Sequence, residues 1–202
     1  MIYESYPWKC YLARQVQALL RRKEQKRWPE SSMACVERDV FMCGYALRKL
    51  IEAKKLSDEV ESVGLDVTMH PWTGKTVDIM SRHDLHLAYD LTQEQRQQMG
   101  LREFCNQIVH SFVFQMRFLE AGGLDGIYVA SDYSKQQGVY FVEIDEIIRV
   151  LELAVEDDIC EIITHREKIG GEWKIVRKSN RALSDGEPRR LHRRSARQLG
   201  LA

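Results

Sequence analysis

The sequence predicts an α+β protein in which a helical bundle core carries inserted and C-terminal β-hairpins. Apolar residues recur every three or four positions between Trp8 and Leu56, a spacing typical of amphipathic helices. In the last third of the chain, short runs of β-branched and aromatic residues surround polar turns. No strand–helix–strand series runs along the chain, so a parallel sheet is not expected.

The N-terminal segment predicts two antiparallel helices. Residues 8–26 carry an apolar stripe that begins at Trp8 and has basic residues between its members. Pro29 interrupts this pattern, and Ser31 and Ser32 offer caps for a second helix that continues to about Leu56. The short turn between the two helices favours a helical hairpin. The apolar stripe of the second helix comprises Val36, Val40, Cys43, Leu47, Leu50 and Ile51.

The middle of the chain predicts an inserted β-hairpin and then a long helix. The runs 66–69 and 76–79 flank a turn-like segment that contains Pro71 and Gly74. Farther on, Thr92 is followed three residues later by Gln95, the spacing of a capping box. We therefore expect a helix that begins near Thr92, bends near Gly100 and runs over 101–119.

The C-terminal third predicts two further β-hairpins with a helix between them. Residues 126–130 and 139–142 form the first hairpin, Asp145 caps the helix, and residues 160–163 and 173–176 form the second hairpin. Together these elements predict a single domain over residues 1–177. Its helical core spans 8–120, and its hairpins and last helix span 121–177. A basic tail over 178–202 follows.

Charge is unevenly distributed although the whole chain has a net charge of zero. From Lys178 onward there are seven Lys and Arg residues and two acidic residues, a net charge of +5. A basic segment attracts phosphates whatever their sequence, which makes RNA a candidate partner. The alternative is a solvated chain end without a binding role.

Several classes of protein are disfavoured by what the sequence lacks. No apolar run reaches the roughly 18 residues of a membrane span, and the N-terminal residues do not have the pattern of a signal peptide. We therefore expect a cytoplasmic protein that does not associate with membranes. The five cysteines include no C-x-x-C pair, which predicts free thiols. No nucleotide-binding glycine motif or serine-hydrolase motif is present, and no cofactor is expected.

One row of polar side chains suggests chemistry. In a helix over 101–119, Arg102, Asn106 and His110 are four residues apart and share one side, and Arg117 follows two turns later. A histidine can exchange a proton, an arginine can hold a phosphate and an asparagine can orient either group. We therefore predict metal-independent cleavage of RNA with His110, Asn106 and Arg102 as catalytic residues. Arg117 would bind the substrate. The alternative is an inert polar row at a helix–helix or dimer interface.

Two residues of the second helix are predicted to support the same site. Glu37 and Arg48 have nearly the same angular position beside the apolar stripe, where they could contact substrate. A simple surface ion pair is the alternative. The segment 83–86 and Asp90 contain residue types that bind metals, but they lack the spacing of established metal motifs, so no metal site is predicted.

The run from Asn106 to Ser111 in a long helix, preceded by a helical hairpin, resembles the HEPN superfamily of prokaryotic toxin and antiviral systems. The resemblance covers residues 8–120 and implies a helical domain that binds RNA or a nucleotide. In this family a metal-independent ribonuclease site forms where two such helices meet across a dimer, so a homo-oligomer is implied. Asn106 and His110 match the motif, whereas Cys105 occupies the position of the motif arginine, as in an inactive or binding-only member. The other alternative is a non-catalytic interaction module, a subunit or neutralising partner of a larger complex.

Overall fold

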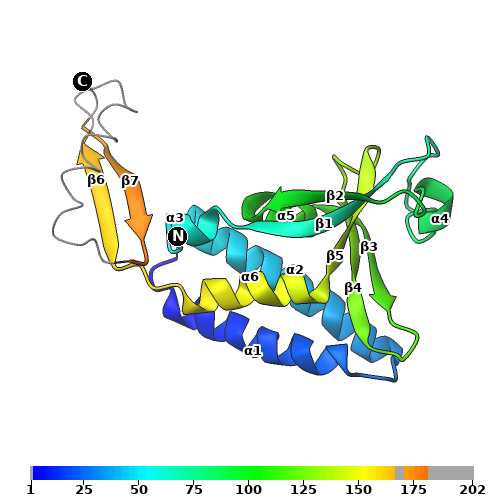
Figure 1. Cartoon of the computed structure of the whole chain (residues 1–202). Helices are drawn as coiled ribbons and strands as arrows, with labels where there is room; N and C mark the ends of the chain where they lie inside the picture. Colours follow the sequence, from blue (N-terminus) through cyan, green and yellow to red (C-terminus); the bar gives the residue numbers. More distant parts are fainter. Residues whose placement is uncertain (1, 167–170, 182–202) are drawn as a thin grey trace.

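A five-stranded antiparallel sheet with helices against one face forms the body of the protein, and a two-stranded hairpin extends from it (Figure 1). The computed structural model describes residues 2–166 and 171–181. The helices are α1 (Tyr6–Lys23), α2 (Glu30–Glu52), α3 (Asp58–Glu61), α4 (Leu85–Ala88), α5 (Leu101–Val109) and α6 (Ile144–Glu156). The strands are β1 (Gly64–Pro71), β2 (Gln95–Gly100), β3 (Ser111–Phe118), β4 (Leu124–Ser131), β5 (Gly138–Glu143), β6 (Glu161–Arg166) and β7 (Trp173–Ser179).

The main sheet has the strand order β2-β1-β5-β4-β3, so β1 joins segments that are distant in sequence. Thr68 of β1 lies opposite Arg96 of β2 on one side and opposite Phe141 of β5 on the other. Tyr128 of β4 is the next neighbour of Phe141 across the sheet. Because side chains directly opposite in an antiparallel pair share a face, these four residues project from the same side of the sheet.

The two faces of the sheet differ in what covers them. We call the face packed against α1, α2, α5 and α6 the inner face, and the opposite face the outer face. The inner face supplies Leu65, Val67, Ile127, Val129 and Val142 to the main apolar core, which the helices complete. Full burial of each such side chain contributes about 1.5–3 kcal/mol to folding. The inner face is thus the one that holds the fold together.

The described residues cover the outer face at one end only. Residues 72–94 connect β1 to β2 and place Val77, Leu85 and Tyr89 in a second apolar cluster with Val113 and Val139 of the sheet. Figure 1 shows α4, part of this connection, at the end of the molecule opposite β6 and β7. The part of the outer face around Thr68, Arg96 and Phe141 lies beyond this cover.

The expected helix over 101–119 is wrong in its second half. α5 ends at Val109, and the chain continues as β3. Phe114 of β3 packs against Phe41 of α2, with the two ring centroids 5.0 Å apart. Phe118 likewise packs on Trp28 at 4.6 Å. Residues 112–118 alternate between the two faces and are rich in aromatic residues, a period of two that suits a strand better than a helix. The residues before α5 form β2, so the helix start expected near Thr92 is also wrong.

The resemblance to the HEPN superfamily is overturned by this fold. HEPN domains are all-helical, whereas the centre of this chain is an antiparallel sheet, and no helical bundle core is present in the part that the structure describes. The expected helical pair is confirmed as α1 and α2. The resemblance was misleading because it depended on the short motif at residues 106–111. Such a motif carries no information about which distant segments pack together.

Of the three expected β-hairpins, the two C-terminal ones are confirmed. They are β4–β5 and β6–β7, with α6 between them. The inserted hairpin over 65–80 is wrong: its first half is β1, but 76–79 is not a strand, and β1 pairs with β2 and β5 instead. The β-propensity of residues 66–69 identified β1. Its partner strands, β2 and β5, lie too far along the chain for a local sequence pattern to reveal the pairing.

Hairpin β6–β7 is attached to the body at α3. Lys178 of β7 is buried, donates from Nζ to the carbonyl of Leu56 at 2.5 Å and forms an ion pair with Glu61. Ser179 Oγ donates to Glu59 at 2.7 Å. The predicted basic tail therefore begins within an ordered strand, and its residues 182–202 lie outside the described residues. None of the helices among the residues described is both long enough and apolar enough to cross a membrane.

Candidate functional site

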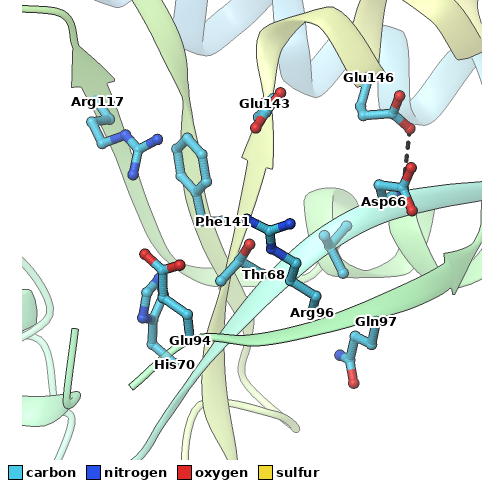
Figure 2. A pocket seen from close by; sticks show the side chains of 11 residues that line it. Asp66, Thr68, His70, Glu94, Arg96, Gln97, Arg117, Phe141, Glu143 and Glu146 are labelled. Atoms are coloured by element: carbon cyan, nitrogen blue, oxygen red, sulfur yellow. Dashed lines mark hydrogen bonds between the residues drawn. The ribbon is translucent and has the colours of Figure 1, made fainter. Parts of the chain in front are cut away.

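A hollow of about 450 Å³ opens on the uncovered part of the outer face. Strands β1, β2 and β5 line it, together with Arg117 of β3 and the start of α6 (Figure 2). Most of its lining is ionic. The charged, aromatic and histidine residues that line it are Asp66, Glu94, Glu143, Glu146, Arg96, Arg117, His70 and Phe141.

The register of the sheet explains why these side chains meet. Asp66, Thr68 and His70 alternate along β1 with residues that enter the core, so all three project from the outer face. Arg96 of β2 and Phe141 of β5 flank Thr68 and share its face. The apolar alternation that builds the inner core therefore also builds the polar row that lines the hollow.

Arg117 is held in place from three sides. Its guanidinium carbon lies 3.4 Å from the ring centroid of Phe141, a stacking contact. Its Nε donates to Asp125 Oδ2 at 2.5 Å, and its Nη1 donates to the hydroxyl oxygen of Tyr128 at 3.4 Å. Burial alone would lower the pKa of Arg117, but the bonds to Tyr128 and Asp125 outweigh it and raise that pKa above its ordinary value. The guanidinium is thus a fixed cation at the border of the hollow.

His70 is buried, with 2% of its surface exposed, yet it lines the hollow. Its Nδ1 lies 3.0 Å from the backbone carbonyl of Gln93. Because a carbonyl only accepts, Nδ1 carries the proton and Nε2 of the neutral ring keeps its lone pair. Asp90 fixes this turn by accepting bonds from Thr92 and from the Gln93 amide, and the bonds from Thr92 lower the pKa of Asp90. His70 therefore has a defined tautomer and a defined orientation.

The four carboxylates of the hollow fall into two classes. Glu146 is satisfied, because it binds Arg149 at 2.7 Å and accepts from the backbone N–H of Asp66 at 3.0 Å (Figure 2). The bond from Arg149 lowers the pKa of Glu146. The carboxylate of Asp66 accepts a bond from the Gln98 amide.

Glu94 and Glu143 form the second class. Within residues 2–166 and 171–181, neither side chain forms a hydrogen bond or an ion pair, and the same holds for Arg96. Glu143 occupies the N-cap position of α6 but makes no capping bond there. Two free carboxylates and one free guanidinium therefore line the same hollow.

A second hollow of about 350 Å³ lies on the other side of Arg117. Its lining includes Tyr128 and Gln115 from the sheet and His83 and His86 from the segment that covers the outer face. Arg117 lines both hollows and stands between them. In the described part of the chain, no three His, Cys, Asp or Glu side chains are grouped closely enough to hold a metal ion.

Some of the site residues predicted from the sequence do lie together, but they form a group separate from the outer-face hollow. Arg48 Nη1 of α2 lies 2.8 Å from Nε2 of His110, which caps the C-terminus of α5. Arg48 also binds Glu52 at 2.9 Å. Arg102 lies on α5, and its charge, like that of Arg48, acts on the buried Cys105 thiol. Asn106 occupies the same short helix.

The remaining two selected residues lie apart from this group. Arg117 belongs to β3 and projects from the outer face, because the chain between His110 and Arg117 is a strand and not a helix. Glu37 lines a separate hollow of about 250 Å³ with Phe41 and Arg82. The predicted row of four polar side chains on one helix therefore does not form.

Cys105, at the position of the motif arginine, is fully buried in the main core. Burial raises the pKa of its thiol to about 12, so the side chain acts as an apolar group.

Sequence reasoning missed His70, Arg96, Phe141 and Glu143. The alternation along β1 carries a usable signal, because a strand with one polar face is either solvated or part of a site. The partner strands, which supply the other groups, were not recoverable from that signal. Comparisons with family models, curated proteins and solved structures found no match. The candidate site therefore depends on the geometry of the outer face.

Proposed function

We propose that the outer-face hollow binds a small organic ligand through an oxyanion, a phosphate or a carboxylate, held by Arg117. The observation that carries this proposal is the fixed guanidinium at the junction of the two hollows. Phe141 holds its plane, Asp125 holds Nε and Tyr128 holds Nη1, which leaves Nη2 without a partner among the described residues and open to a ligand. A group already ordered in the free protein loses little conformational entropy on binding.

The size and charge of the hollow favour a small ligand over a nucleic-acid strand. Its volume of about 450 Å³ is within the range of small-molecule sites, about 300–1,000 Å³. Its lining contains four carboxylates and two guanidinium groups, an acidic balance that repels a polyanion. Free Arg96 is the second group that can contact the oxyanion.

His70 gives the proposed site a group able to take part in chemistry. Its Nδ1 proton is held by the Gln93 carbonyl, so Nε2 can accept a proton from a bound ligand. Because His70 and Arg117 line the same hollow, we propose that a ligand bound at Arg117 gives up a proton to Nε2 of His70.

The proposal is tested by comparing Arg117→Lys with the native chain in calorimetric titrations against a panel of small phosphates and carboxylates. Lysine keeps the charge but loses the planar pair of donors, so we expect affinity to fall by about tenfold or more. Arg14→Gln on α1 is the control, since Arg14 is exposed and bonds only within its own helix. Equal binding by all three proteins would contradict the proposal.

A second candidate function is RNA binding at the surface formed by α2 and α5. The observation that favours it is the 2.8 Å contact between Arg48 and His110, which places a guanidinium beside an exposed imidazole. Arg102 of α5 is a further exposed cation on this pair of helices. Loss of RNA binding, or of metal-independent cleavage, in Arg48→Ala and His110→Ala but not in Arg14→Gln would support this function. Unchanged binding in both variants would exclude it.

Self-association, predicted from the sequence, remains a prediction without its original basis. It depended on the resemblance to the HEPN superfamily, whose sites form across a dimer, and the antiparallel sheet of this chain overturns that resemblance. Light scattering at micromolar concentration tests it directly.

A further inference from the structure

The hollow that contains Arg117 also presents two carboxylates that the fold does not use. Glu143 is exposed at the N-cap position of α6, and its carboxylate makes no capping bond there. Glu94 is exposed just after the turn that orients His70. Figure 2 shows Glu143 and Glu94 on different sides of Phe141, with Arg117 nearby.

The internal pairs of the site leave a negative excess. Glu146 is compensated by Arg149, and Arg117 is compensated on one edge by Asp125. Among the described residues, Glu94 and Glu143 then face Arg96 alone, whereas Asp66 accepts from the Gln98 amide and shares the charge of Arg149 with Glu146. A ligand with a bare oxyanion that binds Arg117 shares the hollow with these carboxylates, and their repulsion is unfavourable.

We infer that the ligand is a zwitterion, whose oxyanion binds Arg117 and whose ammonium group binds Glu143 or Glu94. This inference rests on the function proposed above. A cationic group on the same molecule converts the repulsion from the free carboxylates into attraction and satisfies groups that the fold leaves unpaired. Amino acids and amino-alkyl phosphates both have this chemistry, and the two are separated by the choice of probes.

The experiment is calorimetric titration of the whole chain with matched ligands. The phosphate set is phosphoethanolamine, ethyl phosphate and ethanolamine, and the carboxylate set is β-alanine, propionate and ethylamine. We expect the zwitterion of one set to bind about tenfold or more tightly than its matched anion and its matched amine. The set in which this advantage occurs identifies the oxyanion. This comparison uses the native chain and does not depend on any variant.

Variants assign the effect to the two carboxylates. Glu143→Gln and Glu94→Gln remove a charge but keep the shape, so at least one of them is expected to reduce the zwitterion's advantage to about threefold or less. Binding of the matched anion should stay equal or improve. Glu152→Gln, an exposed carboxylate on the same helix α6, is the matched control and should change neither affinity.

The outcomes separate the inference from the function on which it rests. If the matched anion binds as tightly as the zwitterion and both need Arg117, the inference is overturned and the proposed function stands. If no ligand of either set depends on Arg117, the proposed function fails and the inference fails with it. If the zwitterion's advantage survives in both glutamine variants, the assignment to Glu143 and Glu94 is wrong.

Discussion

The guanidinium carbon of Arg117 lies 3.4 Å above the ring of Phe141, and the ring in turn lies over Gly126 of the neighbouring strand. A Cβ atom at Gly126 would be 2.6 Å from Cζ of Phe141 and 2.4 Å from the carbonyl oxygen of Val142. The absence of a side chain at Gly126 therefore provides the space that the Phe141 ring occupies. The ring in turn positions the guanidinium of Arg117.

Gly126→Ala is expected to lower the free energy of unfolding by roughly 1–3 kcal/mol, because the ring and the adjacent strand must shift to admit a methyl group. It should also weaken ligand binding at Arg117. Urea denaturation measures the first effect and titration the second. Gly100→Ala is the control, since no heavy atom lies within 4 Å of a Cβ there. Equal losses in both variants would contradict this account of Gly126.

Cys105→Arg, which restores the motif arginine of the discarded family resemblance, is expected to destabilise the protein by about 3 kcal/mol or more. The reason is that Cys105 is fully buried and a guanidinium there would have no carboxylate to pair with. Arg102→Ala on the exposed side of the same helix should change stability by no more than about 0.5 kcal/mol. Chemical denaturation compares them, and a stable Cys105→Arg protein would show that α5 does not pack as described.

Glu146→Gln is expected to flatten the acid side of the stability profile. The bond from Arg149 lowers the pKa of Glu146 in the folded protein below its ordinary value of 4.5. The resulting stabilisation is present above pH 4.5 and is lost as the pH falls through the lower folded value. Unfolding experiments between about pH 3 and 6 should show a weaker pH dependence in Glu146→Gln than in Glu152→Gln. Parallel profiles for the two variants would refute the role of Arg149.

His70 is expected to carry its proton on Nδ1 when the ring is neutral, because the Gln93 carbonyl accepts from that nitrogen. Long-range ¹⁵N–¹H correlation spectra of labelled protein distinguish the two tautomers directly. His70→Ala would leave the Gln93 carbonyl unpaired and lower stability by roughly 1–3 kcal/mol. A proton observed on Nε2 would remove the argument that this nitrogen can accept one from a ligand.

The elements that sequence predicted well are those whose partners are close along the chain. The pair α1 and α2, the hairpin β4–β5 and helix α6 each have a periodic pattern and a nearby turn. Strand β2 had neither. Gln95–Gly100 is polar at nearly every position, and only its pairing with β1 makes it a strand.

The candidate site was harder to predict than the fold. His70 and Arg96 lie in segments that the sequence assigned to a hairpin turn and to a helix start, and they meet only through the register of β1 and β2. His110 and Arg48 do lie together, but through the packing of α2 on α5 and not through a single helix. Local patterns report periodicity, whereas both groups depend on contacts between distant segments.

The side-chain Nε–H signal of Arg117 reports on whether this residue holds the oxyanion of a small ligand. In ¹⁵N-labelled protein titrated with phosphoethanolamine, this signal, assigned by its loss in Arg117→Lys, should shift and saturate together with backbone amides of β1 and β5. The Nε–H signal of Arg14 should not move. A ligand that shifts other residues while the Arg117 signal stays fixed, or the absence of any saturable shift with both the phosphate and the carboxylate zwitterions, would contradict this role of Arg117.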